Sequence, residues 1–158
     1  MSGPAVFRYT LPMLPKTAPR PRGGRHNFYN PPEYTRWKAD AALLLAAARA
    51  NHQLPTIEVG CSLMLEFVLP RPKSLPAKGS LHRLYWQKDE DYPYPLRPDI
   101  DNLAKSIKDA MTQAHIWADD ALIVETTQTK HAGDQPGVHI TVHIVEPEQA
   151  DITGVAAK

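Results

Sequence analysis

The sequence is poor in cysteine and in long apolar runs. Its 158 residues include one cysteine, Cys61, which excludes an internal disulfide and fits a reducing compartment. No apolar run approaches the roughly 18 residues that are needed to cross a bilayer. The first residues also lack the basic-then-apolar layout of a secretory signal. We therefore expect a cytoplasmic protein without a membrane partner.

The sequence also lacks the motifs of several common chemistries. It has no glycine-rich phosphate loop, no dinucleotide-binding fingerprint and no serine, histidine and aspartate arrangement for nucleophilic catalysis. No histidine pair or cysteine cluster has the spacing of a zinc site. The search for chemistry therefore turns to the carboxylates.

Proline is abundant, with 16 residues, but none lies between residues 33 and 54 or between residues 99 and 135. Because proline interrupts helices and central strands, regular structure should concentrate in these gaps. Apolar residues three and four apart predict a helix over about residues 33–50. The same spacing predicts a second helix of about four turns that starts at or just after Asp99.

Alternating apolar residues predict four strands, over residues 7–11, 57–69, 121–130 and 138–145. The last two should pair as an antiparallel hairpin. The order of strand, helix, strand, long loop (residues 71–96), helix, strand and strand predicts one α+β domain with a mixed sheet and two main helices. This domain should span residues 1–147, and residues 148–158 should form a flexible tail.

The net charge is only +1, but the charges are unevenly placed. Residues 16–38 hold six Lys or Arg and one acid, and residues 69–88 hold five Lys or Arg and no acid. After Trp117 there are seven acids and two lysines. This separation suits a basic track beside an acidic pocket, as expected for a protein that binds a polyanion around a metal ion. On charge alone, the basic segments could equally be solvated loops.

Both basic segments are candidates for binding nucleic acid. In the first, prolines restrain the backbone while cations project outward, which lowers the cost of ordering it on a phosphate backbone; a disordered basic arm is the alternative. In the 71–96 loop, aromatic residues could stack on unpaired bases or pack the loop against the body. The candidate DNA-binding residues are Lys16, Arg20, Arg22, Arg25, Arg71 and Lys73.

The strongest chemical signal is a set of aspartates around the start of the second helix. Asp99 and Asp101 lie at its entry, which Pro98 marks, and Asp120 follows after a short connection. Carboxylate oxygens are the ligands that Mg²⁺ and Mn²⁺ favour, so these three are the candidate metal ligands. Lys105, one turn beyond Asp101, could stabilise the transition state or simply form an ion pair four residues apart with Asp101 or Asp109.

Two stretches carry a family resemblance: Arg97-Pro98-Asp99-Ile100-Asp101-Asn102-Leu103-Ala104-Lys105 and Trp117-Ala118-Asp119-Asp120-Ala121. With the N-terminal basic segment, residues 7–145 resemble the RusA-type Holliday junction resolvases. The resemblance implies a homodimeric, Mg²⁺-dependent endonuclease that nicks four-way DNA junctions symmetrically. It places the metal-binding aspartates on Asp99, Asp101 and Asp120, and the essential lysine on Lys105. The 71–96 loop is the departure from the compact members, and it bears on substrate preference.

Three alternatives remain open at this point. The same chemistry could act on flaps or replication forks instead of four-way junctions. The chain could be a catalytically silent protein that binds branched DNA, or an interaction module whose acids only cap helices.

A homodimer also follows from the reaction that the resemblance implies. One carboxylate cluster makes one nick, whereas resolution of a junction needs two, and a two-fold axis supplies the second cluster.

Overall fold

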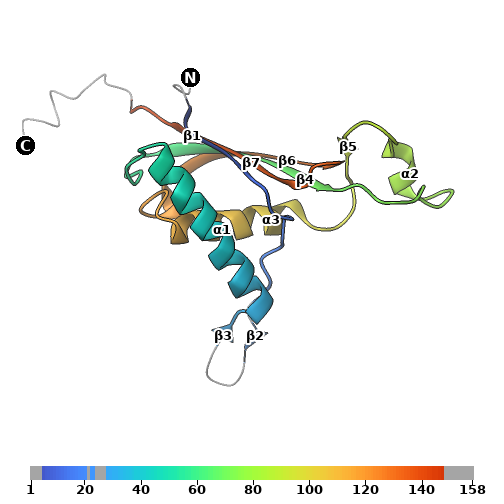
Figure 1. Ribbon diagram of the computed structural model, residues 1–158, viewed down its shortest axis with the longest axis horizontal. Coiled ribbons are helices and arrows are strands. Elements are labelled where there is room, and N and C mark those ends of the chain that lie inside the picture. The colour runs from blue at the N-terminus through green and yellow to red at the C-terminus, as the bar shows by residue number, and fades with distance from the viewer. Residues whose placement is uncertain (1–4, 21, 24–27, 148–158) are drawn as a thin grey trace, which may run out of the picture.

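The protein is described from a computed structural model over residues 5–20, 22–23 and 28–147. Its centre is a five-stranded mixed sheet with the strand order β1-β7-β4-β6-β5 (Figure 1). These strands are β1 (Ala5–Leu11), β4 (Cys61–Pro70), β5 (Tyr92–Pro93), β6 (Ile123–Gly133) and β7 (Gly137–Ile144). Two short strands, β2 (Arg22–Gly23) and β3 (Phe28–Tyr29), pair separately. The predicted α+β fold with a mixed sheet is therefore confirmed.

Two long helices, α1 (Pro32–Asn51) and α3 (Ile100–Gln113), cover one face of the sheet (Figure 1). Leu103, Ile107 and Met111 of α3 are fully buried against the core. Burial of each such side chain stabilises the fold by roughly 1.5–3 kcal/mol. Both helices agree with the sequence prediction, and among the described residues no long helix lies on the opposite face of the sheet (Figure 1).

The central strand β4 decides how the other strands pair. It is parallel to β6 and antiparallel to β7, so the predicted hairpin between residues 121–130 and 138–145 is wrong. Pro70 pairs with Gly133 and Val68 with Gly137, so the connection between β6 and β7 passes the end of β4. The physical reason lies in β4, whose Leu63, Leu65 and Phe67 are buried in the core. As a central strand, β4 pairs with a neighbour on each side, β7 on one and β6 on the other, and so lies between them.

The segment before β4 also differs from the prediction. The strand begins at Cys61 instead of residue 57, and Ile57 forms an isolated bridge with Trp117. Ile57 donates its N–H to the carbonyl of Ile116 at 2.9 Å and accepts from the N–H of Ala118 at 2.9 Å. This bridge fixes the chain after α3, just before the aspartate pair at residues 119 and 120.

The predicted loop over residues 71–96 contains a short helix, α2 (Leu81–Tyr85), and the edge strand β5. A 3₁₀ turn over Asp120–Leu122 leads into β6. Within the described residues, no helix is long and apolar enough to span a membrane. The predicted tail over residues 148–158 lies outside the described part of the chain.

Candidate active site

The start of α3 is built by its own capping residue. Asp99 is in extended backbone, and its Oδ1 accepts hydrogen bonds from the N–H groups of Asp101 at 2.8 Å and Asn102 at 3.4 Å. A cap of this kind stabilises a helix by about 1 kcal/mol. The helix therefore begins at Ile100, and Asp101 lies in its first turn.

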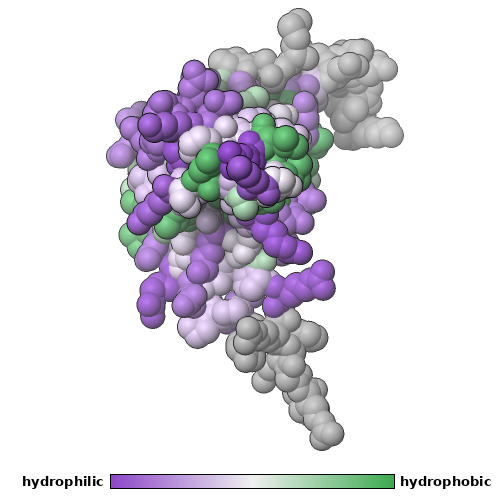
Figure 2. All heavy atoms as spheres, turned by 90° about the vertical axis from the view of Figure 1, so that its right-hand side faces the viewer, coloured by the Kyte–Doolittle hydropathy of each residue, from purple (hydrophilic) through white to green (hydrophobic). Residues whose placement is uncertain are grey.

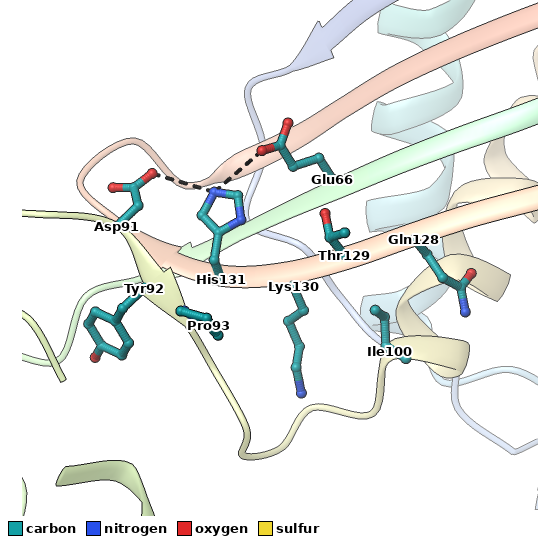
Figure 3. Close-up of a pocket in the computed structure, with 9 residues that line it drawn as sticks. All are labelled: Glu66, Asp91, Tyr92, Pro93, Ile100, Gln128, Thr129, Lys130 and His131. Atoms are coloured by element: carbon teal, nitrogen blue, oxygen red, sulfur yellow. Dashed lines mark ion pairs between the residues drawn. The ribbon is translucent and has the colours of Figure 1, made fainter. Parts of the chain in front are cut away.

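Lys130 of β6 fixes the chain that enters α3. Its Nζ donates to the carbonyl of Leu96 and, at 2.8 Å, to the carbonyl of Pro98. Figure 3 shows this side chain reaching toward the connection between β5 and α3, while His131 points to the other side of the strand. Burial lowers the pKa of Lys130, and the nearby carboxylate of Asp99 acts in the opposite direction.

A hollow of about 420 Å³ lies beside the first turns of α3. Three of the four predicted catalytic residues, Asp101, Lys105 and Asp120, line it together. Its complete lining is Asp101, Ala104, Lys105, Lys108, Asp109, Asp120, Thr126 and Gln128. Residues from α3, from the turn before β6 and from β6 itself thus meet at one place.

Asp99 is not among the residues that line this hollow. In the described part of the chain, no group of three or more His, Cys, Asp and Glu side chains is arranged to hold a metal ion. The three predicted metal ligands therefore do not form one cluster here, and the Oδ1 of Asp99 caps α3. The donor set still fits Mg²⁺, since this ion usually takes one or two carboxylates and completes its shell with water and substrate oxygens.

The carboxylate of Asp101 is held from the sheet. Gln128 Nε2 donates a hydrogen bond of 2.7 Å to Asp101 Oδ1. Gln128 pairs in register with the buried Leu65, so its side chain faces the helices. A neutral amide orients the carboxylate without cancelling its charge, which leaves Asp101 able to bind a cation.

Lys105 forms an ion pair with Asp109, one of the two acids that lie four residues away from it. Its Nζ lies 3.4 Å from Asp109 Oδ2, and its side chain is 60% exposed. Such an exposed pair is worth little, so the ammonium is free to move toward a substrate phosphate. The same oxygen of Asp109 accepts a 2.9 Å hydrogen bond from the Tyr34 hydroxyl of α1. Burial, followed by this hydrogen bond, raises the pKa of Tyr34 above its usual range.

The two adjacent aspartates after α3 differ in their contacts. Asp119 Oδ1 accepts a hydrogen bond of 2.8 Å from the N–H of Ala121, so Asp119 caps the 3₁₀ turn. Asp120 is exposed and lines the hollow with Asp101. Asp119 thus caps the turn, and Asp120 contributes to the lining of the hollow.

Three residues that contact the candidate site or the chain beside it were not predicted from the sequence: Gln128, Lys130 and Tyr34. Gln128 and Lys130 could have been predicted, because the polar residues of β6 alternate between the two faces of the sheet as its apolar residues do. Gln128 and Lys130 pair with Leu65 and Phe67, which face the core, so both side chains lie on the helix side of the sheet. No signal in the sequence pointed to Tyr34, whose partner Asp109 lies 75 positions away.

The first basic segment lies against α3. The N–H of Ala18 donates to the carbonyl of Asn102 at 3.1 Å, and Trp37 Nε1 of α1 donates to the carbonyl of Leu14 at 3.0 Å. Arg20 is exposed, and Lys16 lies 3.5 Å from Glu33. The chain that carries these cations therefore passes the first turn of α3.

The other predicted DNA-binding residues have different outcomes. Only the backbone of Arg22 is described, in β2, and Arg25 lies outside the described residues. Lys73 is exposed. The side chain of Arg71 is only 12% exposed and its Nε lies 2.9 Å from Asp134 Oδ1, so it is not presented to a phosphate. The guanidinium of Arg71 is engaged within the protein, and its role in DNA binding stays a prediction.

A second hollow, of about 740 Å³, lies on the β5 side of β6 (Figure 3). At its rim, His131 Nε2 is 3.4 Å from Asp91 Oδ2 and 3.7 Å from Glu66 Oε1. These contacts join β4, β6 and the chain before β5. They brace the edge of the sheet that carries Lys130.

The family model described as "Endodeoxyribonuclease RusA" matches residues 12–143. The chain belongs to the RusA endodeoxyribonuclease family. The matched range contains the whole candidate site, and membership supports nuclease activity on DNA. The predicted resemblance is thereby confirmed.

The RusA-family chain is also similar to a protein of Bacillus subtilis (strain 168) named "Uncharacterized protein YqaN". The two are 27% identical over 144 residues, which cover 88% of this chain and 96% of the other. The likeness therefore extends over nearly the whole of both proteins. The name of that protein gives no activity.

Proposed function

We propose that this protein is a Mg²⁺-dependent, structure-selective endonuclease that resolves four-way DNA junctions by paired symmetrical nicks in recombination and repair. The observation that carries the proposal is the meeting of Asp101, Lys105 and Asp120 around one hollow of about 420 Å³ in a RusA-family chain. Mn²⁺ should substitute for Mg²⁺, because both favour carboxylate oxygens.

Asp101 and Asp120 are the proposed direct ligands of the ion. Asp99, which caps α3, would be the third ligand. A bound Mg²⁺ supplies positive charge beside the scissile phosphate and lowers the pKa of water. Gln128 keeps the carboxylate of Asp101 oriented while DNA binds.

Lys105 is the proposed cationic catalytic residue. Its exposed ammonium can leave Asp109 and approach the phosphate, where it stabilises the negative charge that develops in the transition state. Water attacks phosphorus as the bond from phosphorus to the 3′ oxygen breaks. That oxygen takes a proton, so the products carry a 5′-phosphate and a 3′-hydroxyl.

Lys16 and Arg20 are proposed to bind the phosphate backbone next to the site, because their segment contacts the first turn of α3. Lys73 is a further candidate from the second basic segment. One site makes one nick, so resolution of a junction requires two copies. We therefore propose a homodimer in which a two-fold axis relates the two hollows.

The test compares cleavage of four-way, three-way and flap DNA of matched arm sequences, with every strand labelled in turn. The proposal expects Mg²⁺-dependent nicks on the four-way junction, at symmetrical positions in two opposite strands. Asp40→Asn, an exposed α1 residue outside the hollow, should behave as the wild type. Preferred cleavage of flaps, or single unpaired nicks, would contradict junction resolution.

A further inference from the structure

The segment of residues 71–91, here called the arm, projects beyond the sheet between β4 and β5 (Figure 1). Arg71 fixes its base. The guanidinium lies 2.9 Å from Asp134 and donates at 2.6 Å to each of the carbonyls of Gln87 and Glu90. The same side chain lies over the ring of Tyr92, 5.8 Å from its centroid. These contacts fasten the two ends of the arm to each other and to the body.

Helix α2, within the arm, turns its polar side inward. His82 is buried, its Nε2 lies 2.7 Å from the Tyr92 hydroxyl, and its ring meets the Tyr94 ring edge-on at 5.2 Å. The opposite arrangement is usual, because a surface helix normally buries its apolar side. His82 therefore makes these contacts between α2 and the body of the protein, and the leucines of α2 take no part in them.

The apolar side chains of α2 face outward. Leu81, Leu84 and Tyr85 are 51%, 80% and 41% exposed. Their spacing of three and four residues places them on one side of the helix. Leu75 of the same arm is also exposed. In Figure 2, which faces this end of the molecule, apolar side chains lie on both sides of a hydrophilic one, and further hydrophilic side chains surround them.

The cations of the arm indicate what covers this patch. Lys73, Lys78 and Lys88 are exposed, and the acids of the arm are confined to its end, at residues 89–91. Exposed apolar groups mark a binding surface, and surrounding cations select a polyanion as its partner. Branched DNA offers both kinds of contact, because bases are partly unstacked at the branch point and phosphates surround them.

Strand β6 connects the arm with the candidate site. Its exit strand β5 pairs with β6 through Tyr92 and Ala132, and the same β6 carries Gln128. From β5 the chain runs directly to Asp99 and the start of α3. The arm and the start of α3 therefore lie toward the same end of the molecule (Figure 1).

We propose that the outward face of α2 binds unstacked bases at the branch point of the DNA. Leu81 and Leu84 insert beside a base step, Tyr85 offers a ring for stacking, and the arm lysines hold the flanking phosphates. The inference rests on the proposed function, because it assumes that branched DNA is the substrate. It gives the arm the task of recognising the junction centre.

The test uses a four-way junction and a matched duplex, each with 2-aminopurine at the same sequence position, next to the branch point in the junction. Binding is measured with Ca²⁺ in place of Mg²⁺. The test variant is Leu81→Ser/Leu84→Ser. The control is Leu43→Ser, because Leu43 is 72% exposed on α1 and lies outside the arm. Circular dichroism and thermal unfolding show that each variant is folded, and Leu84→Ser alone is a milder second variant.

The wild type and Leu43→Ser should raise the fluorescence of the junction probe. The double variant should lose most of this rise, and its Kd for the junction should increase about fivefold or more with an unchanged Kd for duplex. Leu84→Ser should lose part of the rise. Fluorescence and affinity equal to wild type in the double variant would overturn the proposal, as would an equal loss in Leu43→Ser.

Sedimentation of each variant tests the competing occupant, a second copy of the chain. A change of oligomeric state in the double variant alone would assign the patch to self-association and overturn the proposal. Absence of junction binding by the wild type would remove both the proposed function and the inference. Junction binding with the expected fluorescence but without nicking in Mg²⁺ would contradict the proposed function and leave the arm proposal supported.

Discussion

Gln128 Nε2 donates a 2.7 Å hydrogen bond to Asp101 Oδ1, which joins strand β6 to the first turn of α3. Gln128→Leu removes the donor that orients this carboxylate. We expect roughly a tenfold or greater increase in the Mg²⁺ concentration required for nicking, as for other groups that orient metal ligands. A Mg²⁺ titration of junction nicking measures it. Thr127→Val is the control, since Thr127 pairs with Met64 on the opposite side of the sheet.

Asp119 and Asp120 should respond differently to the same change. Asn caps about as well as Asp, so Asp119→Asn should keep the bond to the N–H of Ala121 and change stability by only a few tenths of a kcal/mol. It should also keep most of the nicking rate. Asp120→Asn removes a proposed ligand and should abolish nicking in a folded protein. The assignment would be reversed if Asp119→Asn proved inactive and Asp120→Asn active.

Arg20 should contribute to DNA binding through charge alone. Arg20→Ala should weaken binding to all DNA sequences and reduce the salt slope of log K by about one. The measurement is a series of junction-binding titrations at increasing salt concentration. Arg8→Ala is the matched control, because Arg8 is exposed on β1, whose neighbours Phe7 and Tyr9 pack on the helix side. An unchanged slope in Arg20→Ala would remove Arg20 from the DNA track.

The bond from Tyr34 to Asp109 should appear in the pH dependence of stability. Burial and Asp109 raise the pKa of Tyr34 above its ordinary 10.0, so the folded state keeps a proton that the unfolded state releases. The stability from this group is therefore present below pH 10 and is lost as the pH rises above it. Tyr34→Phe should lose about 1 kcal/mol at neutral pH and show a smaller alkaline loss.

Urea unfolding at neutral pH and at alkaline pH measures both effects of Tyr34→Phe. Tyr85→Phe is the control, because Tyr85 is 41% exposed on α2. It should match the wild type at neutral pH. If Tyr34→Phe lost as much unfolding free energy at alkaline pH as the wild type, Tyr34 would not be the group responsible for that loss.

The helices were predictable because their signals are local. Pro98 and the capping Asp99 adjoin in sequence, and the apolar spacing that follows needs no distant partner. Strand pairing was less accessible, since alternation shows which side of a strand is buried but not which strand lies beside it. The hairpin prediction was wrong for this reason: β6 and β7 each pair with β4.

The candidate site was predictable in its charged residues and less so in their supports. Asp101, Lys105 and Asp120 could be selected from residue type and spacing, and the structure brings them to one hollow. The ion pair of Arg71 could not be predicted from the sequence, because its partner Asp134 is 63 positions away. A cation in a basic segment has the same appearance in sequence whether it meets a phosphate or an internal carboxylate.

The most direct test of the account is nicking of a strand-labelled four-way junction by the wild type and by Asp101→Asn in Mg²⁺, with junction binding measured in parallel. We predict paired symmetrical nicks by the wild type. Asp101→Asn should make no nicks and should bind the junction as well or more tightly, because a negative charge near the phosphate is removed. Nicking by folded Asp101→Asn at the wild-type rate, or loss of its junction binding, would contradict the proposed metal site.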